Sequence, residues 1–84
     1  MKKDELIKRL SELEKNLVWL RQGMPGVTVK SCKALIPSFK TKCGKNITSI
    51  SRDLDKLNPG NQVHRIGKMV GRVHDKIAEI ELES

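Results

Sequence analysis

The stretch Leu6–Met24, with the sequence LIKRLSELEKNLVWLRQGM, sets the fold class of this 84-residue chain. Its apolar residues recur at alternating steps of four and three, at Leu6, Leu10, Leu13, Leu17, Leu20 and Met24. Such steps place every member of the series on one face of an α-helix. The stretch therefore predicts an amphipathic helix with one narrow apolar stripe.

Two further tracts repeat nearly the same spacing. They are formed by Phe39, Cys43, Ile47, Ile50, Leu54 and Leu57, and by Val63, Ile66, Val70, Val73, Ile77 and Ile80. Turn-forming residues separate the tracts at 23–26 and 58–61, and Asp4 and Asn61 are the expected N-caps of the first and third helices. Helices of about 20 residues, each about 30 Å long, pack as antiparallel neighbours when short turns join them. We therefore predict an all-α fold, a small antiparallel three-helix bundle.

The segment 25–37 is expected to add a short helix or turn between the first two long helices. Its alternating valines resemble a strand, but a lone strand would have no partner, so we favour a short helix that starts near Val29. Pro37 suits the start of the second long helix. Inside that helix, Gly44 either causes a kink or marks the true beginning, with Asn46 as the cap.

Length and composition indicate a single helical domain that spans residues 1–84. A chain of this length buries only about 60–65% of the surface that its unfolded form exposes. Strict, narrow apolar stripes are typical of coiled-coil seams, and a second copy would supplement the small core. The sequence therefore favours self-association, for example as a homodimer.

Several kinds of segment are missing from the sequence. It has no run of about 18 apolar residues that could span a bilayer, and no apolar leader follows Met1, so we expect a cytoplasmic protein without membrane contact. In that compartment Cys32 and Cys43 are expected to stay reduced, as two small buried side chains. A disulfide between them remains open, because it depends on the distance that the fold sets.

Charge is distributed unevenly along the chain, whose net charge is +7. No acidic residue lies between Glu14 and Asp53, whereas this interval contains eight bases: Lys15, Arg21, Lys30, Lys33, Lys40, Lys42, Lys45 and Arg52. Asp53 and Asp55 are expected to pair with Arg52 or Lys56 in their own helix. A field of one sign over half of a small domain indicates an anionic partner.

A second basic feature lies on the third predicted helix, where Arg65, Lys68, Arg72 and Lys76 are expected to be exposed in line. Together the two features predict a small basic protein that binds nucleic acid, either duplex DNA or structured RNA, through phosphate contacts. The candidate nucleic-acid-binding residues are Lys30, Lys33, Lys40, Lys42, Lys45, Arg52, Arg65, Lys68 and Arg72. One Trp, one Phe and no Tyr argue against a base-stacking platform for single strands.

The alternative is a non-enzymatic adaptor or inhibitor that docks on an acidic surface of a partner protein. Trp19, Ile7, Val18 and Met69 would then form the protein interface, and charge would steer the encounter. Trp19 lies off the apolar stripe of its helix, so it is either an exposed anchor or covered by the 25–37 segment. The second reading is favoured because that segment must pack on something.

Catalytic, cofactor and metal sites are not predicted. The chain has no Gly-rich phosphate loop and no nucleophile elbow. His64 and His74 are ten residues apart on one helix, about 15 Å along its axis, which is too far for a shared zinc ion. Gly67 and Gly71 each cost about 1 kcal/mol inside a helix. We expect close packing within the bundle to explain them, with the approach of a phosphate backbone as the second reading.

Overall fold

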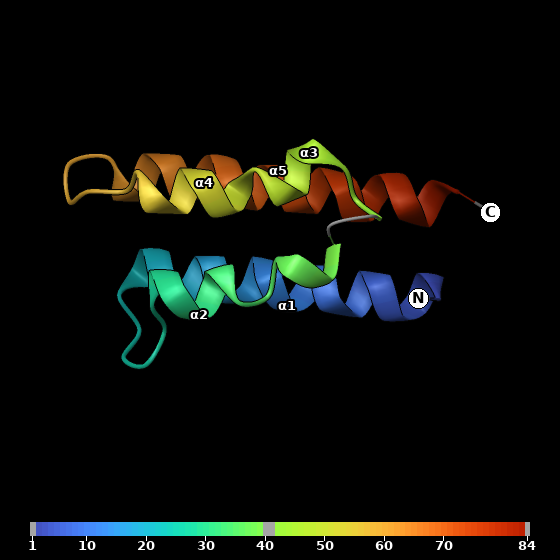
Figure 1. Ribbon diagram of the computed structural model, residues 1–84, viewed down its shortest axis with the longest axis horizontal. Coiled ribbons are helices and arrows are strands. Elements are labelled where there is room, and N and C mark those ends of the chain that lie inside the picture. The colour runs from blue at the N-terminus through green and yellow to red at the C-terminus, as the bar shows by residue number, and fades with distance from the viewer. Residues whose placement is uncertain (1, 40–41, 84) are drawn as a thin grey trace.

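The computed structural model describes residues 2–39 and 42–83, and every regular element in these ranges is helical (Figure 1). The elements are α1 Lys3–Gln22, α2 Val29–Lys33, the 3-10 helix η1 Pro37–Phe39, α3 Lys45–Thr48, α4 Ile50–Asp55 and α5 Gln62–Leu82. The all-α class is therefore confirmed. The three-helix bundle is not confirmed, because only α1 and α5 are long and the second predicted helix is divided among short elements.

The helices run back and forth along the long axis of a body of 40 × 20 × 19 Å (Figure 1). Helices α1 and α5 lie side by side in opposite directions and make the most extensive contact between any two elements. Helix α2 packs on α1 and α4, whereas α3 packs on η1 and α5. The start of α1 and the end of α5 meet, since Lys3 Nζ donates a hydrogen bond to the carbonyl of Glu83.

The two ends of α1 follow from its sequence. Lys2 occupies the N-cap position, so the prediction that Asp4 caps the helix was wrong; Asp4 lies in the first turn, where negative charge suits the helix dipole. Gly23 ends the helix in the left-handed conformation, with φ of 75°, and its amide donates to the carbonyl of Leu20. Only glycine adopts that conformation without a steric penalty.

The short helix near Val29 is present as α2. Thr28 and Ser31 form a capping box, in which the Ser31 amide donates to Thr28 Oγ1 at 3.1 Å and the Thr28 amide donates to Ser31 Oγ at 2.9 Å. Pro37 begins η1, the first helical turn after α2. Local hydrogen bonds thus explain a helix that carries no heptad of its own.

The second heptad tract is buried as predicted, although it is not one helix. Five of its residues are at most 2% exposed, namely Phe39, Cys43, Ile47, Ile50 and Leu54. Gly44, with φ of 68° and ψ of −172°, is the N-cap of α3, so the chain starts a new helix there and Asn46 is not the cap. Essentially only glycine occupies that backbone region. A turn at Ser49 then separates α3 from α4.

Helix α5 is rotated relative to the predicted stripe. Its buried residues are Ile66, Met69, Val73 and Ile80, whereas Val63 is 66% exposed. Met69, a predicted interface residue, is 1% exposed and lies in the core instead of at the surface. Asn61 holds the N-cap position of α5, but its side chain accepts a hydrogen bond from the Asn58 amide at 2.9 Å and does not cap the helix.

The two glycines of α5 are not explained by close packing, contrary to expectation. A Cβ added at Gly67 would meet Arg21 Nη1 at 3.5 Å, an ordinary contact, and one at Gly71 would meet no atom within 4 Å. Neither glycine is therefore required by a neighbouring helix among the described residues. None of the helices in residues 2–39 and 42–83 is long and apolar enough to cross a bilayer.

Candidate nucleic-acid interface

Two grooves flank α4. The α4–α5 groove, of about 440 Å³, is lined by Asp53, His64, Arg65, Lys68, Met69 and Arg72. The α3–α4 groove, of about 660 Å³, is lined by Lys45, Thr48, Ser49, Ser51, Arg52 and Asp55. Asp53 faces the first groove while Arg52 and Asp55 face the second, so the grooves lie on different faces of α4. Five of the predicted phosphate-binding residues line them.

Arg72 is engaged by its own chain at the base of the α4–α5 groove. Its Nη1 donates to Asp53 Oδ2 at 2.6 Å, and its Nε and Nη2 donate to the carbonyl of Asn46 at 3.0 and 2.6 Å. Its Nη2 also donates to Ser49 Oγ. The half-buried guanidinium therefore fastens α3 and α4 to α5 and neutralises Asp53. Its position is that of a structural residue, although the sequence predicted a phosphate ligand.

Asp55 is neutralised by a base from another segment. Lys33 Nζ, on α2, lies 2.7 and 2.9 Å from the two carboxylate oxygens of Asp55, on α4. Both side chains are partly exposed, at 35% and 56%, so the pair contributes at most about 1 kcal/mol to stability. The expectation that Asp53 and Asp55 pair with Arg52 or Lys56 was wrong, since both carboxylates bind distant bases.

Four bases around α4 carry charge that no acid offsets. Lys45, Arg52, Arg65 and Lys68 are all exposed, and none of them forms an ion pair with another residue in the described ranges. With Lys33 and Arg72 they make six bases against two acids, Asp53 and Asp55, an excess of four positive charges. The bases come from α2, α3, α4 and α5, so the fold gathers them from segments distant in sequence.

Other predicted ligands lie elsewhere. Lys42 lines a depression near the end of α5, together with Lys3, Lys76 and the acids Glu79 and Glu83. Lys30 is exposed on α2, and Lys40 lies outside the described residues. The predicted bases therefore do not all form one continuous surface.

Only part of the predicted basic line along α5 is exposed. Arg65 and Lys68 are exposed, whereas Arg72 and Lys76 are half-buried beside the core. Lys76 Nζ lies 3.3 Å from Glu79 on the same helix. The two bases nearest the start of α5 are thus the ones available to an external anion.

The predicted protein-interface residues are not fully exposed. Trp19 is half-buried on α1, with Lys15 Nζ 5.0 Å from its ring centroid, a cation–π contact. Ile7 is half-buried against the core and Val18 is half-buried as well, while Met69 is inside the core. This geometry weakens the case for an apolar anchor built from these four residues.

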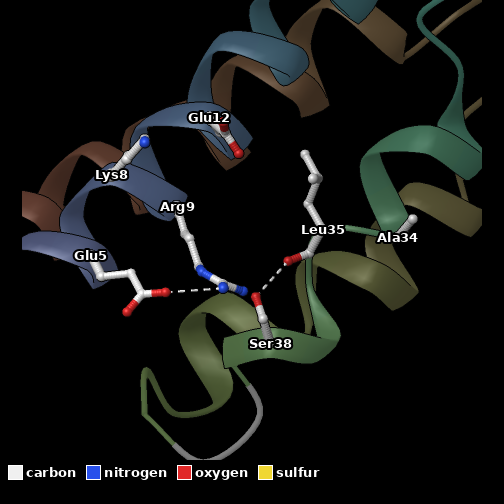
Figure 2. A pocket seen from close by; sticks show the side chains of 7 residues that line it. All are labelled: Glu5, Lys8, Arg9, Glu12, Ala34, Leu35 and Ser38. Carbon is white, nitrogen blue, oxygen red and sulfur yellow. Dashed lines mark hydrogen bonds and ion pairs between the residues drawn. The ribbon is translucent and has the colours of Figure 1, made fainter. Parts of the chain in front are cut away.

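A groove beside α1 differs in charge. Figure 2 shows the space of about 340 Å³ between α1 and residues 34–38, lined by Glu5, Lys8, Arg9, Glu12, Ala34, Leu35 and Ser38. Arg9 Nη2 lies 3.1 Å from Glu5 Oε1, and Ser38 Oγ donates to the carbonyl of Leu35 at 3.0 Å. Two acids match two bases here. This groove is therefore neutral, unlike the grooves beside α4 and unlike the depression at Lys42, where three bases face two acids.

The nucleophilic and metal-binding side chains are scattered. Cys32 and Cys43 are free and buried, and burial raises the pKa of both thiols. His74 Nδ1 lies 3.3 Å from Glu14, whereas His64 lines the α4–α5 groove. The described part of the chain holds no group of three His, Cys, Asp or Glu residues placed to bind a metal ion.

Comparison with protein-family models, curated proteins and solved structures finds no match for this chain. The residues around α4 are therefore the basis for a proposal of function.

Proposed function

We propose that this protein binds nucleic acid by contacting phosphate groups with a surface centred on α4. This α4 basic surface consists of Lys45, Arg52, Arg65 and Lys68. One observation carries the proposal. Cations from distant parts of the chain line two grooves beside α4, while both carboxylates in those grooves already bind another base.

The chemistry of both grooves suits phosphate. Exposed Lys and Arg side chains neutralise phosphate charge, and the release of condensed counterions drives the association. The α3–α4 groove adds the hydroxyls of Ser49 and Ser51, which are neutral donors of the kind that contact phosphate oxygens, whereas Thr48 Oγ1 already donates to the carbonyl of Gly44. Ser49 Oγ accepts from Arg72 and keeps its own proton for donation. The grooves thus combine charge with hydrogen-bond donors.

An acidic protein surface is a weaker match. Hot spots of protein interfaces are enriched in Trp, Tyr and Arg. The α4 basic surface supplies Arg52 and Arg65 but no aromatic residue. The chain has one Trp, one Phe and no Tyr; Trp19 lies on α1 and Phe39 is inside the core. Neither aromatic lines the grooves beside α4. Phosphate binding requires charge alone and therefore fits this surface better.

The test is a fluorescence-anisotropy titration of labelled duplex DNA between about 50 and 200 mM salt. With four phosphate contacts, the logarithm of the association constant should fall linearly with the logarithm of the salt concentration. The expected slope is about −3.6, at roughly −0.9 per contact. The variant K45Q/R52Q/R65Q/K68Q is expected to lose binding. All four substituted side chains are exposed, so circular dichroism should show the same helicity as the parent protein.

The matched control is K2Q/K8Q/K15Q/R21Q, which removes the same charge from exposed positions at or on α1. It is expected to keep most of the affinity. No binding at about 50 mM salt, or an equal loss in the control, would refute the proposal. If no binding is seen, the next test is a search for protein partners that compares the parent protein with Trp19→Ala.

A further inference from the structure

We infer that the α4–α5 groove binds a terminal phosphate, the monoester at a 5′ end of nucleic acid, while the rest of the α4 basic surface contacts internal phosphates. This inference rests on the proposed function and specifies the ligand of one groove. Three features carry it: the close spacing of the basic side chains on α5, the paired charges at the floor of the groove, and the wider spacing of the cations on α3 and α4.

The basic side chains of the α4–α5 groove are concentrated on one turn of α5. His64, Arg65 and Lys68 all line the groove, and all three are exposed. Lys68 lies one turn from both of the others, and positions three or four apart are neighbours on a helix surface. Positions 64 and 68 are only about 6 Å apart along the axis. The three side chains therefore surround one small volume and reach a single anionic group together.

The floor of this groove is already neutralised. Arg72 Nη1 donates to Asp53 Oδ2 at 2.6 Å, and the two side chains are only 31% and 33% exposed. Because this pair cancels its own charge, an incoming anion meets no free carboxylate there. It meets Arg65 and Lys68, which form no ion pair with another residue within 2–39 and 42–83.

A phosphate monoester matches this groove in charge and in hydrogen bonding. At neutral pH it carries about −1.5 to −2 charges and three terminal oxygens, whereas an internal diester carries one charge. Arg65 and Lys68 supply two positive charges. Their N–H groups and the imidazole N–H of His64 supply donors for all three oxygens. An internal phosphate would neutralise only one of the two cations.

The cations of the α3–α4 groove are arranged differently. Lys45 and Arg52 share the outward face of the helical run 45–55, opposite the buried Ile50 and Leu54. They are seven residues apart, about 10 Å along the helix axis, so each meets its own phosphate. This face suits successive diesters of a nucleic-acid strand, whereas the α4–α5 groove suits the phosphate at the end of the strand.

The experiment measures the affinity of the full chain for three internally labelled DNA duplexes of one sequence. The first has a single 5′-phosphate, the second has hydroxyls at both 5′ ends, and the third is closed by loops at both ends and has no terminus. The proteins are the parent, R65Q/K68Q and K45Q/R52Q, and the two variants lose the same charge at exposed positions. All titrations use about 50 mM salt.

The parent should bind the 5′-phosphorylated duplex about tenfold more tightly than the other two, the effect of one hydrogen bond to a charged group. R65Q/K68Q should bind all three duplexes equally, because the terminal phosphate has lost its ligands. K45Q/R52Q should bind all three more weakly and still prefer the 5′-phosphate. Circular dichroism should show the helicity of the parent for both variants.

A free phosphate ester offers the same chemistry without nucleic acid. Inorganic phosphate and adenosine 5′-monophosphate are therefore added as competitors to the phosphorylated duplex at constant ionic strength. Each should remove only the preference for the 5′-phosphate, and only at concentrations far above that of the duplex, because neither contacts Lys45 and Arg52. Competition by the nucleotide at concentrations as low as that of the duplex would assign the groove to a free nucleotide and overturn the inference.

Three further results would overturn the inference: equal affinity of the parent for the phosphorylated and the hydroxyl-terminated duplex, a preference that survives in R65Q/K68Q, or a preference that K45Q/R52Q loses as well. All three leave phosphate binding by the α4 basic surface intact. Absence of binding to every duplex at about 50 mM salt would instead refute the proposed function, and the inference with it.

Discussion

The α1–α5 pair and the middle segment, residues 29–55, use similar apolar spacing to build different structures. Helices α1 and α5 are continuous over 20 and 21 residues. The described part of the middle segment contains four elements, of which the longest has six residues. Apolar spacing therefore selects the buried side chains, whereas single residues with special backbone conformations, such as Gly44, decide whether a helix continues.

The two regions are also stabilised differently. Isolated helices shorter than about 12 residues are marginal in water, so α2, α3 and α4 depend on their neighbours. Core side chains and the contacts of Arg72 and Lys33 provide that support. The helix at the centre of the proposed nucleic-acid-binding surface thus belongs to the region held by tertiary contacts, and the α1–α5 pair serves as its scaffold.

The largest expected effect tests whether the middle segment is part of the core. Phe39 is 0% exposed, so Phe39→Ala should lower the free energy of unfolding by about 3–5 kcal/mol. Leu82, at 85% exposed on α5, is the control, and Leu82→Ala should change it by less than about 0.5 kcal/mol. Equilibrium denaturation in urea measures both. A loss below about 1 kcal/mol for Phe39→Ala would mean that the segment is an accessory to the α1–α5 pair.

One substitution type should have opposite signs in the two regions. Gly44→Ala forces alanine into a conformation reserved for glycine and should destabilise the protein by about 1–3 kcal/mol. Gly71 lies inside α5, where an added Cβ would meet no atom within 4 Å, so Gly71→Ala should stabilise the protein by about 1 kcal/mol. Thermal unfolding followed by circular dichroism compares them. Stability changes of the same sign in Gly44→Ala and Gly71→Ala would contradict this distinction between the two regions.

Arg72→Gln tests the attachment of the middle segment to α5. The change removes the ion pair with Asp53 and the bonds to Asn46, at an expected cost of about 1–2 kcal/mol. In this variant, amide hydrogen exchange should accelerate more in α3 and α4 than in α1. Arg65→Gln removes the same charge from an exposed site on α5 and should change neither stability nor exchange. Equal acceleration of amide exchange in all helices would mean that Arg72 stabilises the whole protein and not only the attachment of α3 and α4 to α5.

The smallest effect concerns pH. Burial raises the pKa of Cys32 and Cys43, so the folded state favours the neutral thiols. Their contribution to stability is complete below the ordinary thiol pKa of 9.0 and is lost as pH rises through the higher pKa of the folded state. The decline in the free energy of unfolding above about pH 9 should be shallower in the variant C32A/C43A. Identical slopes would indicate that the thiols do not titrate with unfolding.

The sequence predicted what depends on local pattern. The leucines of α1, the start of α2 near Val29 and the burial of the second tract all follow from spacing and capping residues. Gly44 was recognised as a possible helix start, but the choice between a kink and a new helix depends on backbone angles that spacing does not reveal. The rotation of α5, which buries Met69 and exposes Val63, depends on all neighbours at once.

The exposure of four candidate bases agrees with the sequence, the ion pairs of the two acids on α4 do not, and the binding role of these bases stays a prediction. Lys45, Arg52, Arg65 and Lys68 carry charge at the surface, which composition already indicated. The partners of Asp53 and Asp55 were missed, because they lie 19 and 22 residues away and meet only after packing. Arg52 and Lys56 were the expected partners because they lie next to these acids in the sequence, but neither of them forms the pair.

The pairing of α1 with α5 has a consequence for synthesis on the ribosome. Roughly 40 residues separate the end of α1 from the start of its main partner, which takes about 2–8 seconds to translate at roughly 5–20 residues per second. During that interval the apolar stripe of α1 can be covered only by the short helices that follow it. The nascent chain therefore passes through an incomplete state in which the leucines of α1 still lack the cover that α5 provides.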